Sequence, residues 1–163
     1  MVLAQPNYLA QMSRSSHDVA AIMTLGAQAA AVTTASAAAV LVRQSGRTRL
    51  GALHDEDVGR RETFAAALGV VPLDGPASPF STALESGQNA LLGIDGLAFG
   101  DARPEWASHF DRLGIGALGI TPLIAGDRAL GLLVTARLGT DDRMSTEDLA
   151  EQASVASHLT TFL

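Results

Sequence analysis

The sequence predicts a single α+β domain whose antiparallel β-sheet is covered by helices on both faces. The predicted elements follow one another as a helix, two strands, helices, a strand, a helix, two strands and a helix. Short turns join the strands near each end of this order, and such turns force antiparallel pairing. The strand predicted over 128–138 is apolar on both sides. One face carries Leu130, Leu132, Val134 and Leu138, and the other carries Ala129, Gly131 and Leu133. A sheet with such strands must be buried on both sides.

The first helix is marked by a capping pattern. Residues 1–14 read as a lead-in that is loose or helical. The segment Ser15-Ser16-His17-Asp18 then has the form of a helix start, in which a serine caps the helix and an acid follows three residues later. The helix is expected to run to about residue 32. Its apolar stripe consists of Val19, Ile22, Met23 and Ala30.

A β-hairpin is predicted next. The apolar runs 37–43 and 47–54 flank a Gln-Ser-Gly turn. Strict alternation places Leu50 and Ala52 on the same face of the second strand. The charged stretch 55–69 follows and is expected to be helical in its second half.

The middle of the chain is expected to hold two short helices and one strand. Ser78 caps the first helix, Pro79 lies in its first turn, where a missing N–H costs nothing, and Gly87 ends it. A third strand covers 89–94. A further helix begins at Pro104 and runs to about residue 112.

Two longer strands and a closing helix complete the chain. The strands 115–124 and 128–138 form a hairpin around a Gly-Asp turn. A capping pattern over 145–148 begins a helix that runs to about Phe162. Its apolar stripe consists of Leu149, Ala153, Ala156, Leu159 and Leu163. Neither a repeat nor a linker divides the chain, so residues 1–163 are expected to form one domain.

The segment Gly114–Gly119, GIGALG, matches the glycine spacing of a dinucleotide-binding loop, but its context does not. Such a loop follows a hydrophobic strand and opens a helix at its third glycine, where amide groups bind pyrophosphate. Here the preceding residues have a helical pattern, and Pro122 penalises helical geometry at Thr121. The glycines are therefore interpreted as residues that permit close packing along a strand.

Composition excludes several classes of function. The net charge of −6 argues against a nucleic-acid-binding surface, which needs clustered cations. All 11 basic residues are arginine and no cysteine occurs, so lysine Schiff bases, thiolate nucleophiles and cysteine-ligated metals are excluded. No catalytic constellation is visible and the histidines are scattered, so we expect neither an enzyme nor a metal site. Without a signal peptide or a membrane-like apolar run, the protein is expected to be cytoplasmic and not inserted in a membrane.

Several motifs resemble the GAF domain family, and together they cover most of the chain. Thr121-Pro122-Leu123, the Gly126-Asp127 turn and the run 129–133 are similar to the family's "PL…G…G.L" hairpin. The segment 144–149 resembles the family's "F-[ST]-x-E-D" helix start, with Met144 where phenylalanine is usual. The helix starts at 79–87 and 104–106 are similar to those of actinobacterial sensor proteins.

The resemblance implies a fold and a role. The expected fold is a central antiparallel sheet of about six strands, with the terminal helices on one face and a ligand pocket, short helices and loops on the other. The expected role is a non-catalytic sensory or regulatory domain that binds an unidentified small molecule in a signal-transduction protein. The family's cyclic-nucleotide signature, bilin attachment and sulfoxide reductase activity are not expected, because the lysine or cysteine that each needs is missing.

The implied pocket would be lined by apolar side chains with a few polar groups, as small-molecule sites usually are. The candidate ligand-binding residues are Phe80, Leu84, Leu92, Trp106, His109, Phe110 and Ile120. The alternative is that these residues fill the core and leave no cavity. His109 also makes haem a lesser alternative, although it lies about one turn earlier than the family's haem-binding histidine. No other cofactor is implied.

A second hypothesis is a ligand-free module that dimerises or contacts other proteins. The first helix has small residues along one side, and the last helix carries its apolar stripe to Phe162 and Leu163. In GAF proteins such terminal helices often pair between subunits, so a homodimer is expected. An exposed apolar stripe left over after the sheet is covered would favour this hypothesis.

Overall fold

The computed structural model describes residues 5–14, 18–34, 37–55, 57–70, 73–74, 78–93, 114–138 and 144–163. Its elements, in chain order, are α1 (Gln5–Arg14), α2 (Val19–Thr34), β1 (Ala37–Gln44), β2 (Arg47–His54), α3 (Val58–Val70), α4 (Pro79–Ser86), β3 (Ala90–Gly93), β4 (Ile115–Ala125), β5 (Arg128–Leu138) and α6 (Thr146–Phe162). The predicted order of helices and strands is confirmed for these elements. The helix predicted over 104–112 lies outside the described residues.

The described strands form one antiparallel sheet in the order β2-β1-β5-β4-β3. About six strands were expected, and five segments of the described chain enter the hydrogen-bonded sheet. The two hairpins lie side by side, so that β1 and β5, from opposite ends of the chain, are neighbours at the centre of the sheet.

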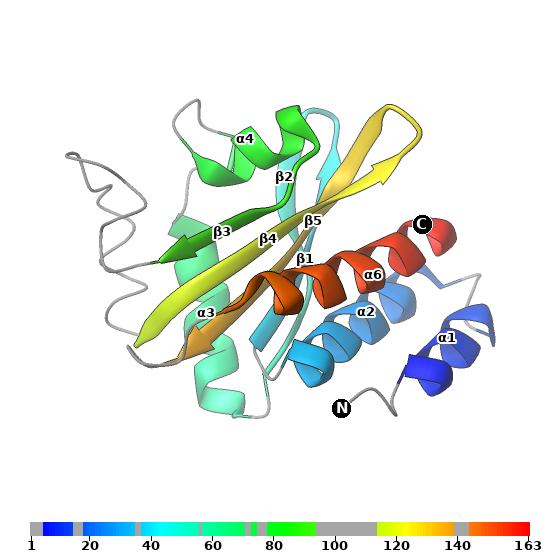
Figure 1. Cartoon of the computed structure of the whole chain (residues 1–163), viewed down its shortest axis with the longest axis horizontal. Helices are drawn as coiled ribbons and strands as arrows, with labels where there is room; N and C mark the ends of the chain where they lie inside the picture. Colours follow the sequence, from blue (N-terminus) through cyan, green and yellow to red (C-terminus); the bar gives the residue numbers. More distant parts are fainter. Residues whose placement is uncertain are drawn as a thin grey trace.

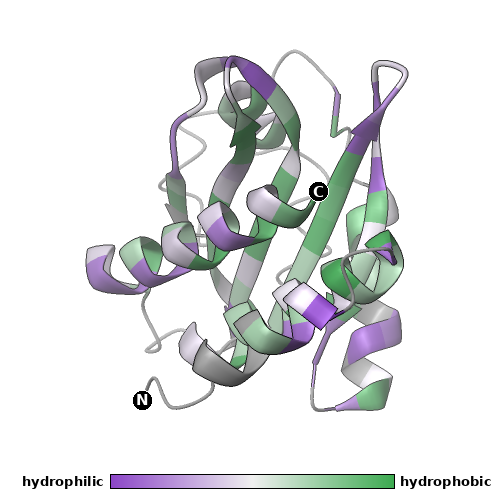
Figure 2. Cartoon of the chain, turned by 90° about the vertical axis from the view of Figure 1, so that its right-hand side faces the viewer, coloured by the Kyte–Doolittle hydropathy of each residue, from purple (hydrophilic) through white to green (hydrophobic). Residues whose placement is uncertain are grey.

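Helices cover both faces of the sheet (Figure 1). The terminal helices α2 and α6 lie side by side on one face, with α1 packed against α2, and α3 and α4 lie on the other face. Two separate apolar clusters fill the two layers. Figure 2 shows hydrophobic strand centres behind the terminal helices, and hydrophilic hairpin tips. The sheet thus separates two cores that share the same strands.

Two β-bulges correct the predicted strand faces. In β2, Leu50 pairs with Leu41 and Ala52 pairs with Val40, so Gly51 is an extra residue. Leu50 and Ala52 therefore lie on opposite faces, because a bulge reverses the alternation of side chains beyond it. In β5, Leu130 is the extra residue, and it packs with the α2/α6 cluster instead of sharing the face of Leu132.

Helix caps agree with the sequence patterns at two helices and differ at the third. At α4, Ser78 accepts a hydrogen bond from the Phe80 amide, and Gly87 ends the helix with φ of 68°. At α6, Ser145 and Asp148 form a reciprocal capping box. At α2, the cap is Asp18 and not a serine, because its carboxylate accepts from the Ala21 amide at 3.1 Å.

The glycine motif lies in a strand. Residues from Ile115 onward belong to β4, and Gly119 lies within it, opposite Thr135 of β5. No helix opens at Gly119, so the segment lacks the helix N-terminus that a dinucleotide-binding loop needs. A side chain at Gly119 would come within 2.6 Å of Gln152 Oε1 and Met144 Sδ. The glycine therefore makes room for α6 on the sheet.

Candidate functional site

The residues predicted to line a pocket are brought together on the α3/α4 face, as far as the structure describes them. Phe80 and Leu84 of α4 and Ile120 of β4 belong to one apolar cluster, with exposed fractions of 0%, 4% and 0%. The backbone of Leu92 pairs with Leu118 of β4. The remaining predicted wall, Trp106, His109 and Phe110, lies outside the described residues. The prediction for that wall, with its haem alternative, therefore stays a prediction.

The described part of this face is chemically apolar. The cluster also includes Phe64 and Leu68 of α3 and Leu118 and Val134 of the sheet. Polar groups beside the cluster belong to the cap of α4, where the Ser81 hydroxyl donates to the Ser78 carbonyl oxygen at 3.1 Å, and to the start of α3, where Arg61 donates to the carbonyl oxygen of buried Asp55 at 2.8 Å. Among the described residues, no three His, Asp or Glu side chains form a group that could hold a metal ion. Phe80, Leu84 and Ile120 are buried in this cluster, as expected if they fill the core. A ligand that reaches these residues would be recognised by shape and apolar contact.

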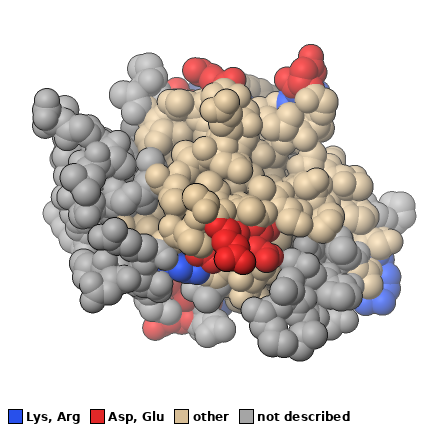
Figure 3. Space-filling view, viewed as in Figure 1, with Lys and Arg blue, Asp and Glu red and all other residues tan. Residues whose placement is uncertain are grey.

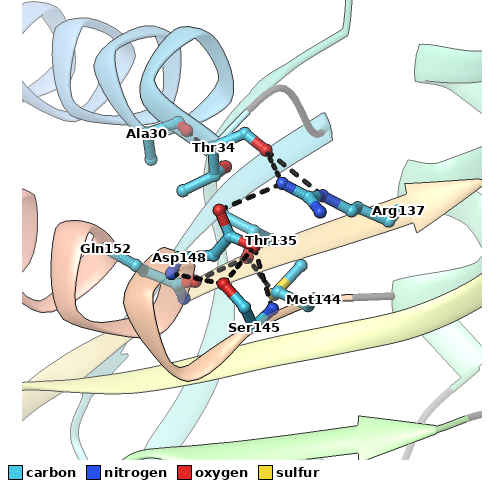
Figure 4. A network of polar contacts seen from close by, with 8 residues as sticks. All are labelled: Ala30, Thr34, Thr135, Arg137, Met144, Ser145, Asp148 and Gln152. Atoms are coloured by element: carbon cyan, nitrogen blue, oxygen red, sulfur yellow. Dashed lines mark hydrogen bonds and ion pairs between the residues drawn. The ribbon is translucent and has the colours of Figure 1, made fainter. Parts of the chain in front are cut away.

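The opposite face carries a buried polar contact between α6 and the sheet (Figure 4). Gln152 of α6 is fully buried, and its amide nitrogen donates to the carbonyl oxygens of Gly119 and Leu133, each at 2.9 Å. Thr135 donates to Gln152 Oε1 at 2.5 Å. One side chain of the last helix is thus bonded to both strands of the β4–β5 hairpin.

The strands β4 and β5 also contribute side chains to the apolar cluster on the α3/α4 face. Leu118, Ile120 and Val134 point into the α3/α4 cluster, while their neighbours Gly119 and Thr135 contact Gln152. Successive residues of a strand face opposite sides of the sheet. A displacement of β4 or β5 on the candidate ligand side therefore moves the groups that hold α6.

A second polar contact joins the ends of the two terminal helices. The Arg137 guanidinium donates to the Thr34 carbonyl oxygen at the end of α2, at 3.2 Å from Nε and 2.6 Å from a terminal nitrogen. The same group lies 3.2 Å from a carboxylate oxygen of Asp148, in the first turn of α6. A cation at a helix C-terminus and an anion at a helix N-terminus are both favoured by the helix dipoles.

The pKa of Asp148 is lowered by this environment. Burial acts to raise the pKa of the carboxyl group, but hydrogen bonds from Ser145 and the charge of Arg137 outweigh it. Because the folded pKa lies below the unfolded one, the resulting stability is present above the unfolded pKa and is lost as the pH falls through the folded value.

We therefore expect the free energy of unfolding to drop as the pH falls below about 4, the ordinary value for an aspartate. Asp148→Asn should show a shallower drop, because the substituted side chain does not titrate. Urea denaturation between neutral and acidic pH measures both curves. Parallel curves for the two proteins would contradict this prediction.

Thr121 buries a hydroxyl group that has no hydrogen-bond partner among the described residues. Its side chain is 3% exposed on the α2/α6 face, and its oxygen has no partner within the described part of the chain. Thr121→Val should therefore stabilise the fold by about 1 kcal/mol, since valine has the same shape and no polar group to bury. Thr135→Val is the matched control: it removes a hydroxyl that is bonded to Gln152 and should destabilise. If the two substitutions change the melting temperature in the same direction, the prediction is contradicted.

The polar contacts between α6 and the sheet were not predicted from the sequence. Gln152 lies among the apolar residues of α6 and has no motif of its own. A faint signal exists for Arg137, the sole charged residue within the apolar run 129–138. Neither signal names a partner, because the partners are a carbonyl at the end of a distant helix and carbonyls inside the sheet.

The surface around α6 shows a local excess of negative charge. Figure 3 shows acidic side chains gathered on the face that carries α6, and Glu147 and Asp148 occupy its first turn.

In the described residues, no helix is both long enough and apolar enough to cross a lipid bilayer.

Comparison with known proteins agrees with this architecture. A GAF domain family model matches residues 18–159. No protein with a curated description matches the sequence.

Solved structures share the fold at low sequence identity. They include a GAF domain/HD domain protein of Geobacter sulfurreducens (TM-score 0.71, 14% identity, 94% of each chain covered). A second is the GAF domain of a phosphoenolpyruvate-protein phosphotransferase of Coxiella burnetii (0.66, 16%, 98% of this chain and 92% of that one). A third is a domain assigned to a two-component sensor histidine kinase protein of Sinorhizobium meliloti (0.61, 17%, 86% of each). On the extent of the family match, the chain belongs to the GAF domain family.

Proposed function

We propose that the chain is a non-catalytic sensory domain of a cytoplasmic signalling protein. It binds a small molecule on the α3/α4 face of the sheet and transmits binding to the terminal helices. Domains of this family are sensory and regulatory parts of signalling proteins, which supports the role. The apolar cluster around Phe80, Leu84 and Ile120 supports the location of the ligand.

The observation that carries the proposal is the double use of β4 and β5. Their side chains contribute to the candidate ligand side, and their carbonyl groups hold Gln152 of α6. A ligand that binds one arrangement of the strands better than another shifts the population toward that arrangement. The hydrogen bonds of Gln152 then carry the change to the last helix without any intervening loop.

Native mass spectrometry of the purified chain, compared with its denatured mass, tests for a ligand that is retained. Extra mass that disappears on denaturation supports binding, and a Soret band identifies haem. If nothing is retained, a compound panel should contain a ligand that raises the melting temperature. At about 100 times its Kd, a ligand stabilises by roughly 2.7 kcal/mol, or several degrees for a chain of this size.

The ligand should also slow amide exchange on both faces, in α4 and in α6. Protection confined to α4 would contradict the relay. If no mass is retained and no compound in a broad panel shifts the melting temperature, the binding function is overturned.

A second candidate function is ligand-free dimerisation through the terminal helices. The whole of α2 lacks charged residues, and Val19 and Val32 are 50% and 47% exposed. The exposed residues of α6 beyond its first turn are also uncharged, namely Ala150, Ser154, Ser157 and Thr161. In a chain with 17% charged residues, the absence of charge on the outer side of α2, and among the exposed residues of α6 beyond its first turn, favours contact with a second copy.

Ser154→Arg tests this second function, because it places a charge on the outer face of α6. It should dissociate a dimer in native mass spectrometry, whereas Ala66→Arg on the exposed side of α3 should not. A wild-type chain that stays monomeric across the concentration range of the experiment would rule out the homodimer.

A further inference from the structure

The terminal helices α2 and α6 run in opposite directions across the sheet. Thr34, at the end of α2, and Asp148, at the start of α6, both contact Arg137. Further along, Gly26 of α2 lies against the side chain of Leu159. The two helices therefore contact each other over most of their length.

Most of that contact is apolar. The residues that α2 buries are small or aliphatic, chiefly alanines, and α6 contributes Val155, Ala156 and Leu159. The hydrophobic driving force is itself non-directional, and among these small side chains the tight contact of Gly26 with Leu159 fixes one point of the helix pair. At the other end, where α2 ends and α6 begins, Arg137 adds directional hydrogen bonds and an ion pair.

Arg137 is suited to this task because it belongs to a third element. It lies near the end of β5, next to Ala136, whose side chain lies in the α3/α4 cluster. Its guanidinium is planar and presents several donors in a fixed arrangement, so it can bond two groups at once. The side chain is 13% exposed, so solvent screens these contacts less than it would at the surface.

We propose that Arg137 is the positioning residue that couples β5 to both terminal helices and sets the axial position of α2 against α6. A shift of β5 then moves the end of α2 and the start of α6 together. This inference rests on the proposed sensory function for its purpose, but the coupling exists in the protein without any ligand.

The coupling can be measured with two spin labels, because the chain has no cysteine of its own. Cysteines at the exposed positions Val32 and Thr161 place labels near opposite ends of the helix pair, roughly 15 Å apart along the axis at 1.5 Å per residue. Arg137→Met should broaden the distribution of label distances. It should also speed amide exchange at least tenfold in the last turn of α2 and the first turn of α6. Arg128→Met, at the exposed tip of the same strand, should change neither.

Two further variants separate coupling from a general loss of stability. Arg137→Lys keeps the charge near Asp148, but it cannot reproduce the two guanidinium hydrogen bonds to the Thr34 carbonyl oxygen. It should therefore restore slow amide exchange in α6 more than in α2. Val134→Ala shortens a side chain of β5 on the α3/α4 face. It should shift the label distance when Arg137 is present, but not when it is combined with Arg137→Met.

The proposal is overturned if amide exchange in both turns stays within twofold of the wild type. It is also overturned if Arg137→Met raises exchange equally in every helix, or if Val134→Ala shifts the label distance equally in both backgrounds. None of these measurements uses a ligand. A failure of small-molecule binding and a failure of the Arg137 coupling are therefore seen separately.

Discussion

Replacing Gly131 with alanine is expected to destabilise the chain by roughly 3 kcal/mol or more, a cost at the upper end of overpacking in a core. A β-carbon at Gly131 would overlap the main-chain oxygen of Leu41, and a backbone group cannot move aside as a flexible side chain can. The overlap lies between β5 and β1, the two central strands, so relief would separate the hairpins. The melting temperature should fall by roughly 6–12 °C for a chain of this length.

Gly69→Ala is the matched control for this experiment. Gly69 is exposed near the end of α3, and nothing in the described part of the chain lies within 4 Å of an added β-carbon. The same substitution there should leave the stability unchanged or raise it by up to about 1 kcal/mol, since alanine favours a helix over glycine. If both variants melt within a degree or two of the wild type, the central strands must adapt, and the contact between β1 and β5 is not a fixed one.

The ends of the helices could be predicted because their signals are local. Ser78 and Gly87 bracket α4, and Ser145 with Asp148 opens α6, each by hydrogen bonds within a few residues. The faces of β2 and β5 could not be predicted, because Gly51 and Leu130 are bulged within hairpins whose strands the sequence identifies but whose register it does not. The central pairing of β1 with β5 could not be predicted because it joins strands from opposite ends of the chain, with no turn between them.

The candidate site divides in a similar way. Phe80 and Leu84 were found because they are apolar residues at helical spacing beside a clear cap. Gln152 was missed because a buried glutamine is recognisable only through its acceptors, which lie 33 and 19 residues away in the sequence. The predictable part of the site is thus the apolar lining, and the unpredictable part is the polar coupling across the sheet.

Gln152→Leu is expected to cost about 2–4 kcal/mol. It removes three hydrogen bonds, each contributing about 1 kcal/mol net, and it leaves the hydroxyl of Thr135 without this acceptor in a buried layer. Urea denaturation measures the loss. Gln28→Leu, on the exposed side of α2, is the control and should change the stability little. A loss below about 1 kcal/mol would show that the contacts of Gln152 do not hold α6 on the sheet.

Gln152→Glu separates hydrogen bonding from packing, because it changes the chemistry of the side chain and almost none of its shape. The new carboxylate would be buried facing the carbonyl oxygens of Gly119 and Leu133, which accept and cannot donate. Its folded pKa should therefore lie above the ordinary glutamate value of about 4.3.

A protonated carboxyl group at position 152 can still donate to one carbonyl oxygen. The stability that this bond supplies is fully present below the unfolded pKa and is lost as the pH rises through the folded one. The deficit of Gln152→Glu relative to the wild type should thus be small near pH 4 and several-fold larger at pH 8, as measured by urea denaturation, whereas the deficit of Gln152→Leu should not depend on pH. A deficit of Gln152→Glu that is constant with pH would mean that its carboxyl group reaches solvent, and that α6 leaves the sheet more readily than the buried contacts of Gln152 imply.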